Sequence, residues 1–563
     1  MNIELFEDSS ADHFINSYLS LMDRLMSWNH QYIHWHFSYL GTKQRFSSPF
    51  AKILPEFFSQ SKTKQVHREN FSSLSFPTLL GDFSIECLAD GKRQLRLQHT
   101  FRTKLQKVLR QIRFQASWLK QFLVALRKVL KTQKRIKSNK KKQDVTCIIK
   151  SFTYKNSFNS KNQFNDPYFK ELSNLLAQQD NNIKIATVVE GADQPNFKNQ
   201  QLLVSRDVDP IEKFLRLSDV LKSFFTLSWK ILIKPFRIDG PLFFDEIEIT
   251  TLVKEIFSTN KWNISFCQSL YYDIGKNIIR TYPALKSVMI TYEGNPWERM
   301  LIKGLREGKH DIHIVGYQHS VVPQSALSMF MGKKEAEYMY QPNTLLTTGE
   351  APKSIIEQYG DNSKQSVIAA CALRYDHLHK ISHERCRPDP ERIKILVAME
   401  GLEEATFLLL YAIRQAELNP KIVFRVRAHP ALSFSQMLQY TNYQGPFPDN
   451  LEISENCTLE ADIIGTDILL YWGTTVALEA VLMGKPIVHL DRGDLLSYDP
   501  LFQLKSFKWV ATPDLDIMIL IDDIIKLSDQ EFNNLAGQAR DYVLSYFHPV
   551  TDQNLAPCLD QIS

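Results

Sequence analysis

The sequence Tyr471-Trp472-Gly473-Thr474-Thr475-Val476-Ala477-Leu478-Glu479-Ala480 lies between two short apolar runs, 468–470 and 487–490. An apolar run, a turn with two hydroxyl groups, a helix of small residues and a second apolar run predict a strand–turn–helix–strand unit of a parallel sheet. A helix N-terminus carries free N–H groups and about half a positive charge, so it attracts anions. We therefore expect Gly473, Thr474 and Thr475 to form a phosphate-binding turn. Glu479, one helical turn further on, would reach a ribose hydroxyl.

Length and composition indicate a globular protein of several domains. The chain has 563 residues, of which 44% are hydrophobic and 23% charged, enough for about two to four domains. Its seven cysteines are widely spaced and include no C-x-x-C pair, which argues against a zinc site or a disulfide framework and for a reducing compartment. The acidic N-terminus lacks the layout of a signal peptide, and no uncharged apolar run reaches the ~20 residues that span a bilayer. We expect a cytoplasmic protein.

The positive charge of the chain is concentrated in one segment. Between Arg102 and Lys142 there are fifteen Lys and Arg residues and no Asp or Glu. Within 101–137, apolar residues recur at ~3.6-residue spacing with basic residues on the flanks and back, which predicts an amphipathic helix. Two interpretations stay open. The helix binds an anionic inner-membrane surface, where each Lys or Arg contributes about 1 kcal/mol, or it packs on the protein's own core with a solvated basic face. We expect no nucleic-acid partner.

The order of the predicted elements divides the chain into three parts. Residues 1–143 are expected to form a mainly helical extension that contains this basic helix and ends in a linker at 137–143. Short apolar runs alternate with helical patterns from 144 to 384, and again from 385 to 563 after a proline-containing linker at 385–390. A tail helix is expected at about 533–546. The predicted fold class is α/β, with two doubly wound Rossmann-type domains that face a cleft, where such sheets bind ligands.

A histidine follows a predicted strand of the second α/β domain. Residues 421–427 read as a buried strand that ends in Ala428, His429 and Pro430. The proline restricts the histidine backbone to extended geometry. At the carboxyl end of a parallel strand, His429 is placed to donate to a phosphate or a nucleotide carbonyl, and Arg427 would add charge. A histidine held by a backbone carbonyl is the ordinary alternative, but the Thr474-Thr475 pair later in the same domain favours a binding role.

The His429-Pro430 strand end, together with a hydroxyl pair that opens a helix, resembles the donor half of GT-B glycosyltransferases. It is most similar to bacterial surface-polysaccharide enzymes (lipopolysaccharide, O-antigen or capsule) that use CMP-activated Kdo or nonulosonic acids. The resemblance implies GT-B architecture, a glycan or lipid-linked glycan acceptor, and contacts from His429, Thr474 and Thr475 to CMP, with Glu479 as a further contact. The pair is Thr-Thr here, where Ser-Ser or Ser-Thr is commoner. A CDP-glycerol- or UDP-sugar-dependent enzyme (a polyol-phosphate transferase or an epimerase) and a non-catalytic scaffold of the same fold stay as alternatives.

Three loops of the first α/β domain carry the candidate catalytic residues. Predicted strands end at Tyr292, Tyr317 and Thr348, and they lead into Glu293, His319 and Glu350. Inverting transfer needs a base for the acceptor hydroxyl and donors for the leaving phosphate. We expect Glu293 to be the base and His319 the alternative base or a phosphate donor. Glu350 is a further candidate, and so is Arg374, which would pair with a donor phosphate or lie in an ordinary surface salt bridge.

Two absent motifs narrow the ligand class. The sequence contains no Walker-type loop and no G-x-G-x-x-G after its first predicted strand, which disfavours ATP and NAD. No obvious D-x-D lies at a strand end, so a metal-clamped donor is not expected. We predict no metal and no cofactor, with a nucleotide-sugar donor as a substrate.

Overall fold

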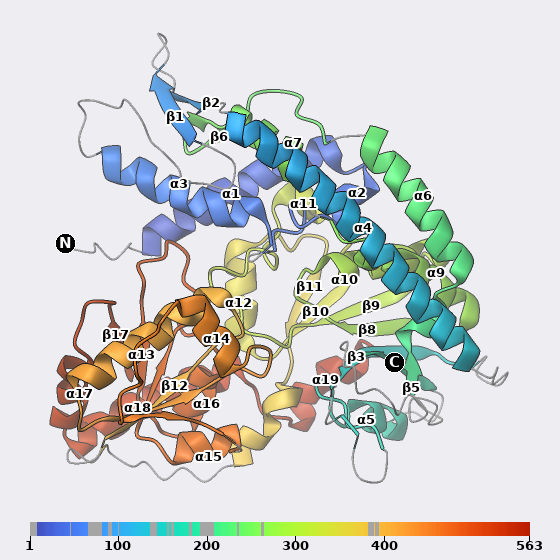
Figure 1. Cartoon of the computed structure of the whole chain (residues 1–563). Coiled ribbons are helices and arrows are strands. Elements are labelled where there is room, and N and C mark those ends of the chain that lie inside the picture. The colour runs from blue at the N-terminus through green and yellow to red at the C-terminus, as the bar shows by residue number, and fades with distance from the viewer. Residues whose placement is uncertain are drawn as a thin grey trace.

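Figure 1 shows the computed structural model of the chain. The structure describes residues 8–44, 47–65, 82–87, 93–98, 101–135, 144–154, 157–158, 163–179, 183–191, 208–233, 236–260, 264–380, 388, 393–455 and 457–562. The predicted linkers at 137–143 and 385–390 therefore lie outside the described residues, apart from Pro388. No described helix is both long enough and apolar enough to cross a bilayer.

The middle of the chain forms a seven-stranded parallel sheet, the middle sheet, in the order β11-β10-β9-β8-β3-β4-β5. The strands are β3 (Cys147–Thr153), β4 (Ile185–Gly191), β5 (Val208–Pro210), β8 (Ser287–Thr291), β9 (His313–Tyr317), β10 (Thr344–Thr347) and β11 (Ser366–Ala369). Because helices cover both faces of such a sheet, its strands are apolar on both sides, and every residue of β8 is buried. The strand order reverses between β3 and β8.

The C-terminal part forms a second parallel sheet, the C-terminal sheet, in the order β14-β13-β12-β15-β16-β17. Its strands are β12 (Lys394–Ala398), β13 (Val423–Arg427), β14 (Leu451–Ile453), β15 (Ile468–Tyr471), β16 (Ile487–Leu490) and β17 (Lys508–Ala511). Here the order reverses between β12 and β15. Two doubly wound parallel sheets confirm the predicted α/β class and the GT-B-like arrangement that the resemblance implied.

Helices flank both sheets. Those of the middle part are α5 (Leu172–Gln179), η3 (Ile211–Phe214), α6 (Leu217–Ile233), α7 (Thr250–Asn260), α8 (Phe266–Ser269), α9 (Tyr271–Thr281), α10 (Pro296–Gly308), α11 (Lys333–Tyr338), α12 (Glu350–Tyr359) and η4 (Leu373–Lys380). Those of the C-terminal part are η5 (Glu403–Ala405), α13 (Thr406–Leu418), α14 (Phe434–Thr441), α15 (Leu459–Ile464), α16 (Val476–Leu482), α17 (Ile517–Lys526), α18 (Asp529–Tyr546) and α19 (Asp552–Asp560).

The N-terminal extension is helical, as predicted, but it also contributes two strands. Its elements are α1 (Asp8–Asn29), α2 (Ile33–His36), α3 (Pro49–Gln65), β1 (Asp82–Cys87), β2 (Arg93–Gln98) and α4 (Phe101–Arg135). β1 and β2 form a small sheet with β7 (Ile247–Glu248) and β6 (Phe243–Phe244), in the order β1-β2-β7-β6. The extension thus shares a sheet with residues from the middle of the chain, a pairing that local pattern does not reveal.

The C-terminal tail returns to the middle sheet. α18 contacts both α16 and α12, and α19 packs against β11. The Tyr546 hydroxyl accepts from the Val322 N–H at 2.6 Å, and Ser287 Oγ donates to the Ile562 carbonyl at 2.8 Å. The predicted tail helix therefore exists as α18, and it carries the chain from one α/β unit back to the other.

Candidate active site

Most of the predicted site residues follow strands at their carboxyl ends. Glu293 comes after β8 and His319 after β9, while His429 comes after β13 and Gly473 after β15. β8 and β15 stand where the strand order of each sheet reverses, the position at which doubly wound sheets bind ligands. The topology therefore places both groups of candidates at the positions that a ligand would use.

Glu293 and His319 lie side by side. Glu293 Oε1 is 3.5 Å from His319 Nε2, and the Glu293 side chain is 37% exposed against 11% for His319. Burial lowers the pKa of His319, and the Glu293 charge partly offsets this. The turn between Glu293 and α10 needs a glycine at position 294. Gly294 has a φ of +74°, and a Cβ there would come 2.2 Å from the Ser328 carbonyl oxygen. The two predicted catalytic residues thus form an accessible carboxylate beside a neutral imidazole, the Glu293–His319 pair.

A second carboxyl group, absent from the sequence analysis, lies next to this pair. Glu298 is 1% exposed, and its carboxylate accepts hydrogen bonds from the Glu293 and Asn295 N–H groups and from Asn295 Nδ2 at 2.7–3.2 Å. Burial, followed by the charge of Glu293, raises the pKa of Glu298 to about 8. Asn295 and Glu298 form the capping box of α10. The Asn-x-x-Glu spacing was a readable signal for a group that holds the Glu293 loop.

Lys150 of β3 is a buried cation near the same pair. It is 1% exposed, and its Nζ lies 3.1 Å from Glu190 Oε2 and within 3.7 Å of the ring centroids of Phe152 and Trp297. Burial lowers the pKa of Lys150 to about 8, and its charge lowers the pKa of His319 further. The sequence did not single out Lys150, because its burial depends on Trp297, a ring from another segment of the chain.

Two glycines, Gly401 and Gly473, allow close contacts among the residues predicted to bind the donor. A Cβ on Gly401 would lie 2.5 Å from His429 Nδ1, and a Cβ on Gly473 would lie 2.6 Å from Glu400 Oε1. Glu400 and Gly401 follow β12, so the ends of β12, β13 and β15 touch one another at this point. His429 Nδ1 accepts from the Ala431 N–H at 3.1 Å, which leaves Nε2–H of the neutral ring as a donor. The sequence analysis missed Glu400, which is 7% exposed at the end of an apolar strand.

The turn after β15 contains the hydroxyl pair as predicted. Pro430 begins an exposed turn next to His429, and Thr474 and Thr475 precede α16, a helix of seven residues. Thr474 is 7% exposed, and its Oγ1 accepts from the Val476 N–H at 3.4 Å. Burial raises the pKa of the Tyr375 phenol, and the Thr475 hydroxyl acts against this shift, so Thr475 faces η4.

Glu479 lies in the first turn of α16. Burial raises the pKa of its carboxyl group from 4.5 to about 7, while the charges of Arg374 and then Arg427 lower it. A carboxyl group that titrates near neutral pH is costly to keep in a folded protein, and such groups concentrate at functional sites.

Two predicted residues are engaged elsewhere. The Arg427 guanidinium pairs with the fully buried Asp462 and donates to the Cys457 carbonyl at 3.1 Å. The Glu350 carboxylate lies 2.8 Å from Lys353 Nζ, and the Glu350 N–H donates to His548 Nε2 at 3.3 Å. No described contact joins Glu350 to the Glu293–His319 pair, and Arg427 reaches the donor side only through its charge.

Arg374 connects the two groups of residues. Its Cζ lies 5.7 Å from the ring centroid of Tyr168, whose ring is 4.5 Å from that of His319. On the other side, burial and then the Arg374 charge lower the pKa of His429, and the same charge acts on Glu479. Arg374 is exposed and makes no ion pair within the part of the chain that the structure describes. Of the two roles that the sequence left open, the structure does not show the surface salt bridge.

A metal site is not evident. The described residues contain no group of three or more His, Cys, Asp or Glu side chains that could hold a metal ion. That the donor binds without a metal therefore stays a prediction from the sequence.

Glu479→Gln is expected to stabilise the protein at pH 8.5 but much less at pH 5. A carboxyl pKa raised from 4.5 to about 7 means that stability is highest below the unfolded-state value and is lost as the pH rises through the folded-state value. Glutamine never carries the charge, so it avoids a cost of at most about 3 kcal/mol. Urea unfolding at the two pH values measures the difference.

The matched control for this prediction is Glu357→Gln, which changes an exposed carboxylate on α12. A gain for Glu479→Gln that is the same at both pH values would contradict the pKa shift.

Comparisons with known proteins find similarity among solved structures. No model of a protein family matches the sequence, and no curated protein does. The N-terminal domain of Candida albicans trehalose-6-phosphate phosphatase has a TM-score of 0.42 at 12% identity, covering 74% of this chain and 98% of that one. A glycosyltransferase from Rickettsia africae has a TM-score of 0.41 at 12% identity, covering 75% and 98%. The UDP-GlcNAc 2-epimerase of Neisseria meningitidis has 0.38 at 11%, covering 74% and 99%. Likenesses with TM-scores this low carry no argument, so the function rests on the site.

Proposed function

We propose that this protein is a GT-B glycosyltransferase that transfers a sugar from a CMP-activated donor, of Kdo or nonulosonic acid type, to a glycan acceptor in bacterial surface-polysaccharide synthesis. One observation carries the proposal. An accessible carboxylate–imidazole pair lies after the middle sheet, and a histidine–threonine–glutamate group lies after the C-terminal sheet. Both groups share the exposed guanidinium of Arg374, which has no ion pair among the described residues. A base on one side and anion-binding donors on the other are the groups that glycosyl transfer requires.

In this reaction the acceptor hydroxyl oxygen attacks the anomeric carbon as the bond from that carbon to the CMP phosphate oxygen breaks. Glu293 takes the hydroxyl proton, and the neutral His319 imidazole lies beside it, with Nε2 3.5 Å from Glu293 Oε1. CMP leaves with the bonding electron pair, and Arg374, His429 Nε2–H and the threonine hydroxyls stabilise its phosphate. Attack opposite the leaving group inverts the anomeric configuration.

The nucleotide is the first element to test. CMP and CTP are expected to raise the melting temperature, whereas UMP and UDP are not. His429→Ala should weaken CMP binding about tenfold, because it removes one hydrogen bond to the nucleotide. Isothermal titration gives the affinities, with the exposed His310→Ala as the matched control.

The alternatives are separate outcomes of this experiment. Stabilisation by UDP or UMP alone would replace the CMP donor with a UDP-sugar transferase or epimerase. A larger effect of CDP-glycerol than of CMP would favour polyol-phosphate transfer. No response to any nucleotide would leave a non-catalytic scaffold.

We also propose that α4 and α6 bind an anionic membrane surface and so bring the enzyme to lipid-linked acceptors. The two helices lie side by side (Figure 1) and contact each other. α4 packs inward through Trp118, Ala125 and Val129, which are at most 5% exposed. Most of the described residues in the stripe predicted from the sequence are instead exposed: Val108, Leu109, Ile112, Leu119, Leu123 and Leu130 are 41–56% exposed. Leu126 of the same stripe packs against the core.

α6 extends this surface in a way that the sequence analysis did not foresee. Phe225 and Trp229 are each 68% exposed on α6. Four exposed basic residues on α4 accompany the apolar groups: Arg113, Lys120, Arg127 and Lys131. Exposed aromatic and aliphatic side chains among Lys and Arg are typical of helices that lie in the headgroup region of an anionic bilayer.

Changing these four basic residues to glutamine is expected to lower binding to anionic vesicles by about two orders of magnitude or more, at about 1 kcal/mol for each charge. Phe225→Ser with Trp229→Ser should lower it too, because these side chains insert between headgroups. Co-sedimentation with vesicles of 30% phosphatidylserine measures both effects.

Ile519→Ser is the matched control for the apolar changes, since Ile519 is 54% exposed on α17. Unchanged binding in the charge variant, or equal binding to neutral vesicles, would contradict the membrane proposal.

A further inference from the structure

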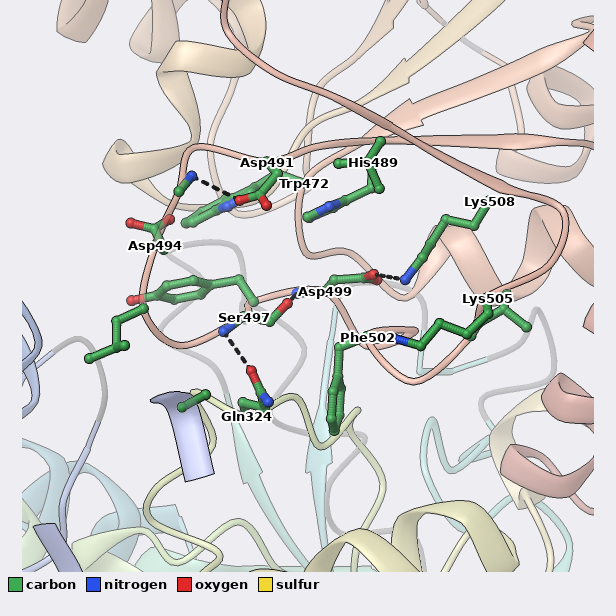
Figure 2. A pocket seen from close by; sticks show the side chains of 16 residues that line it. Gln324, Trp472, His489, Asp491, Asp494, Ser497, Asp499, Phe502, Lys505 and Lys508 are labelled. Carbon is green, nitrogen blue, oxygen red and sulfur yellow. Dashed lines mark hydrogen bonds and ion pairs between the residues drawn. The ribbon is translucent and has the colours of Figure 1, made fainter. Parts of the chain in front are cut away.

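A cavity of about 270 Å³ lies at the carboxyl ends of β15 and β16. Figure 2 shows the side chains around it, most of which come from the loops after these two strands. Trp472, the residue before Gly473, lines the cavity, whereas none of the predicted site residues does. The cavity is therefore a separate space beside the turn that carries Gly473 and the threonine pair.

Both α/β units contribute to the walls. Gln324, from the loop after β9, lines the cavity and accepts a hydrogen bond from the Ser497 N–H at 3.2 Å (Figure 2). Beside it, the Ser325 N–H donates to the Ser497 carbonyl at 3.1 Å. A ligand in this space would touch both units and lie between the acceptor side and the donor side of the proposed reaction.

One part of the wall is aromatic. The Trp472 and Tyr498 rings lie 4.5 Å apart at an angle of 31°, and Phe502 is nearby in the same lining. The Arg492 guanidinium lies 5.0 Å from the Trp472 ring centroid and is held by Asp494 through two hydrogen bonds of 2.8 and 2.9 Å. Flat apolar rings of this kind suit the C–H face of a sugar or another ring-shaped ligand.

The charges around the cavity balance. Lys508 Nζ lies 2.8 Å from Asp499 Oδ2, and this carboxylate also accepts from the Tyr471 hydroxyl at 2.8 Å. Asp494, also in the lining, is paired with Arg492. The remaining charged residues of the lining are Asp491 and Lys505, which have opposite charges. Because no positive charge is in excess, the cavity does not suit a phosphate or a sugar carboxylate.

His489 is a buried polar residue with one ring nitrogen that lacks a partner among the described residues. The residue is 7% exposed, and its Nε2 has no hydrogen-bond partner in that part of the chain. Figure 2 shows its ring at the cavity between Trp472 and Asp499. A buried ring nitrogen without a partner costs stability, so it is expected to bind a ligand group or a water molecule in the complete site. Together with the Gln324 amide and the Asp491 carboxylate, it offers the donors and acceptors that hydroxyl groups bind.

We propose that this cavity binds the ring of a neutral, polyhydroxylated ligand, which is one monosaccharide unit. An aromatic wall, hydroxyl-binding groups and balanced charge match that chemistry. The volume lies just below the roughly 300–1,000 Å³ of typical ligand pockets, which fits one ring but not a nucleotide. Only the identification of the ring as part of a substrate rests on the proposed function. Because a donor sugar of Kdo or nonulosonic acid type carries a carboxylate, the neutral ring would belong to the glycan acceptor.

Ligand-observed NMR on the full chain tests the proposal, with methyl glycosides of glucose, galactose and N-acetylglucosamine and with the acidic methyl glucuronide. At least one neutral glycoside should bind, about tenfold or more tighter than the glucuronide. His489→Phe and Gln324→Leu should each raise its Kd about tenfold, because each removes a hydrogen bond to a hydroxyl. His310→Phe, at an exposed site, is the matched control and should change nothing.

The same variants separate this proposal from the proposed function. Neither His489→Phe nor Gln324→Leu touches the nucleotide group, so CMP should bind both as it binds the wild type. If the ring belongs to the acceptor, only the glycoside responds to these changes. If a nucleotide-linked neutral sugar instead binds more tightly than its nucleotide and His489→Phe removes the difference, the cavity holds the donor sugar and the Kdo or nonulosonic acid donor of the proposed function is wrong.

Three results would overturn the monosaccharide site. The first is that no neutral glycoside binds at about 50 mM, a concentration near the weakest affinity that the method resolves. The other two are tighter binding of the glucuronide and glycoside affinities that are unchanged in both variants. If His489→Phe does not fold, Gln324→Leu decides the outcome alone.

Discussion

Glu293→Gln is expected to lower kcat by about two to four orders of magnitude while CMP affinity stays within about twofold. The glutamine has almost the same shape but cannot take the acceptor proton, and a positioned general base contributes roughly 10²–10⁴ to the rate. Glu293 is the accessible member of the pair, 37% exposed. Transfer rates with saturating donor and a CMP titration measure the two quantities.

The matched control is Glu357→Gln, which changes an exposed carboxylate and should leave kcat at the wild-type value. His319→Gln completes the experiment. If Glu293→Gln keeps its rate and His319→Gln loses it, then His319 is the base and Glu293 is not.

Arg374→Met is expected to raise the Kd of CMP by about 30-fold or more with little change in folded stability. A hydrogen bond to a charged group contributes about 1.5–3 kcal/mol, and Arg374 would make such bonds with the donor phosphate. Arg374 has no ion pair in the described structure, so the free energy of unfolding should change by only about 0.5 kcal/mol. Calorimetric titration and urea unfolding measure the two effects.

Arg216→Met is the control, since Arg216 is exposed and distant in sequence from the site residues. Arg374→Lys adds a second check, because a lysine keeps the charge but not the two-pronged geometry and should recover only part of the affinity. A loss of stability as large as the loss of binding would instead show that Arg374 has a structural role.

The strands were readable from the sequence because burial on both faces makes each parallel strand a short apolar run. The strands predicted at 287–292, 312–317, 468–470 and 487–490 are β8, β9, β15 and β16 to within one residue. Since parallel strands share the same end, a polar residue after such a run is placed at the sheet edge. His429 and Thr474 were found in this way.

Residues that depend on other segments were not found. Lys150 is buried by Trp297, which lies 147 residues away in the chain. Glu400 meets the site only because Gly473 has no side chain. His489 reads as one more strand residue, and its unpartnered nitrogen is visible only when the loop around Tyr498 is in place. No local pattern carries such information, because periodicity reports which face is buried and not what buries it.

The amphipathic helix α4 shows what local sequence determines and what only tertiary packing decides. Spacing alone predicted a helix with an apolar stripe and basic flanks over 101–137, since side-chain periodicity is local, and the structure has this helix at Phe101–Arg135. Which stripe faces the protein depends on its neighbours. Phe122 stacks on Phe224 at 4.2 Å and Trp118 Nε1 donates to Ser228 at 3.0 Å, so the helix turns this side inward and leaves Leu119, Leu123 and Leu130 exposed. The role of Arg374 likewise depends on tertiary structure, because the packing of the two sheets brings residues that are distant in sequence beside it.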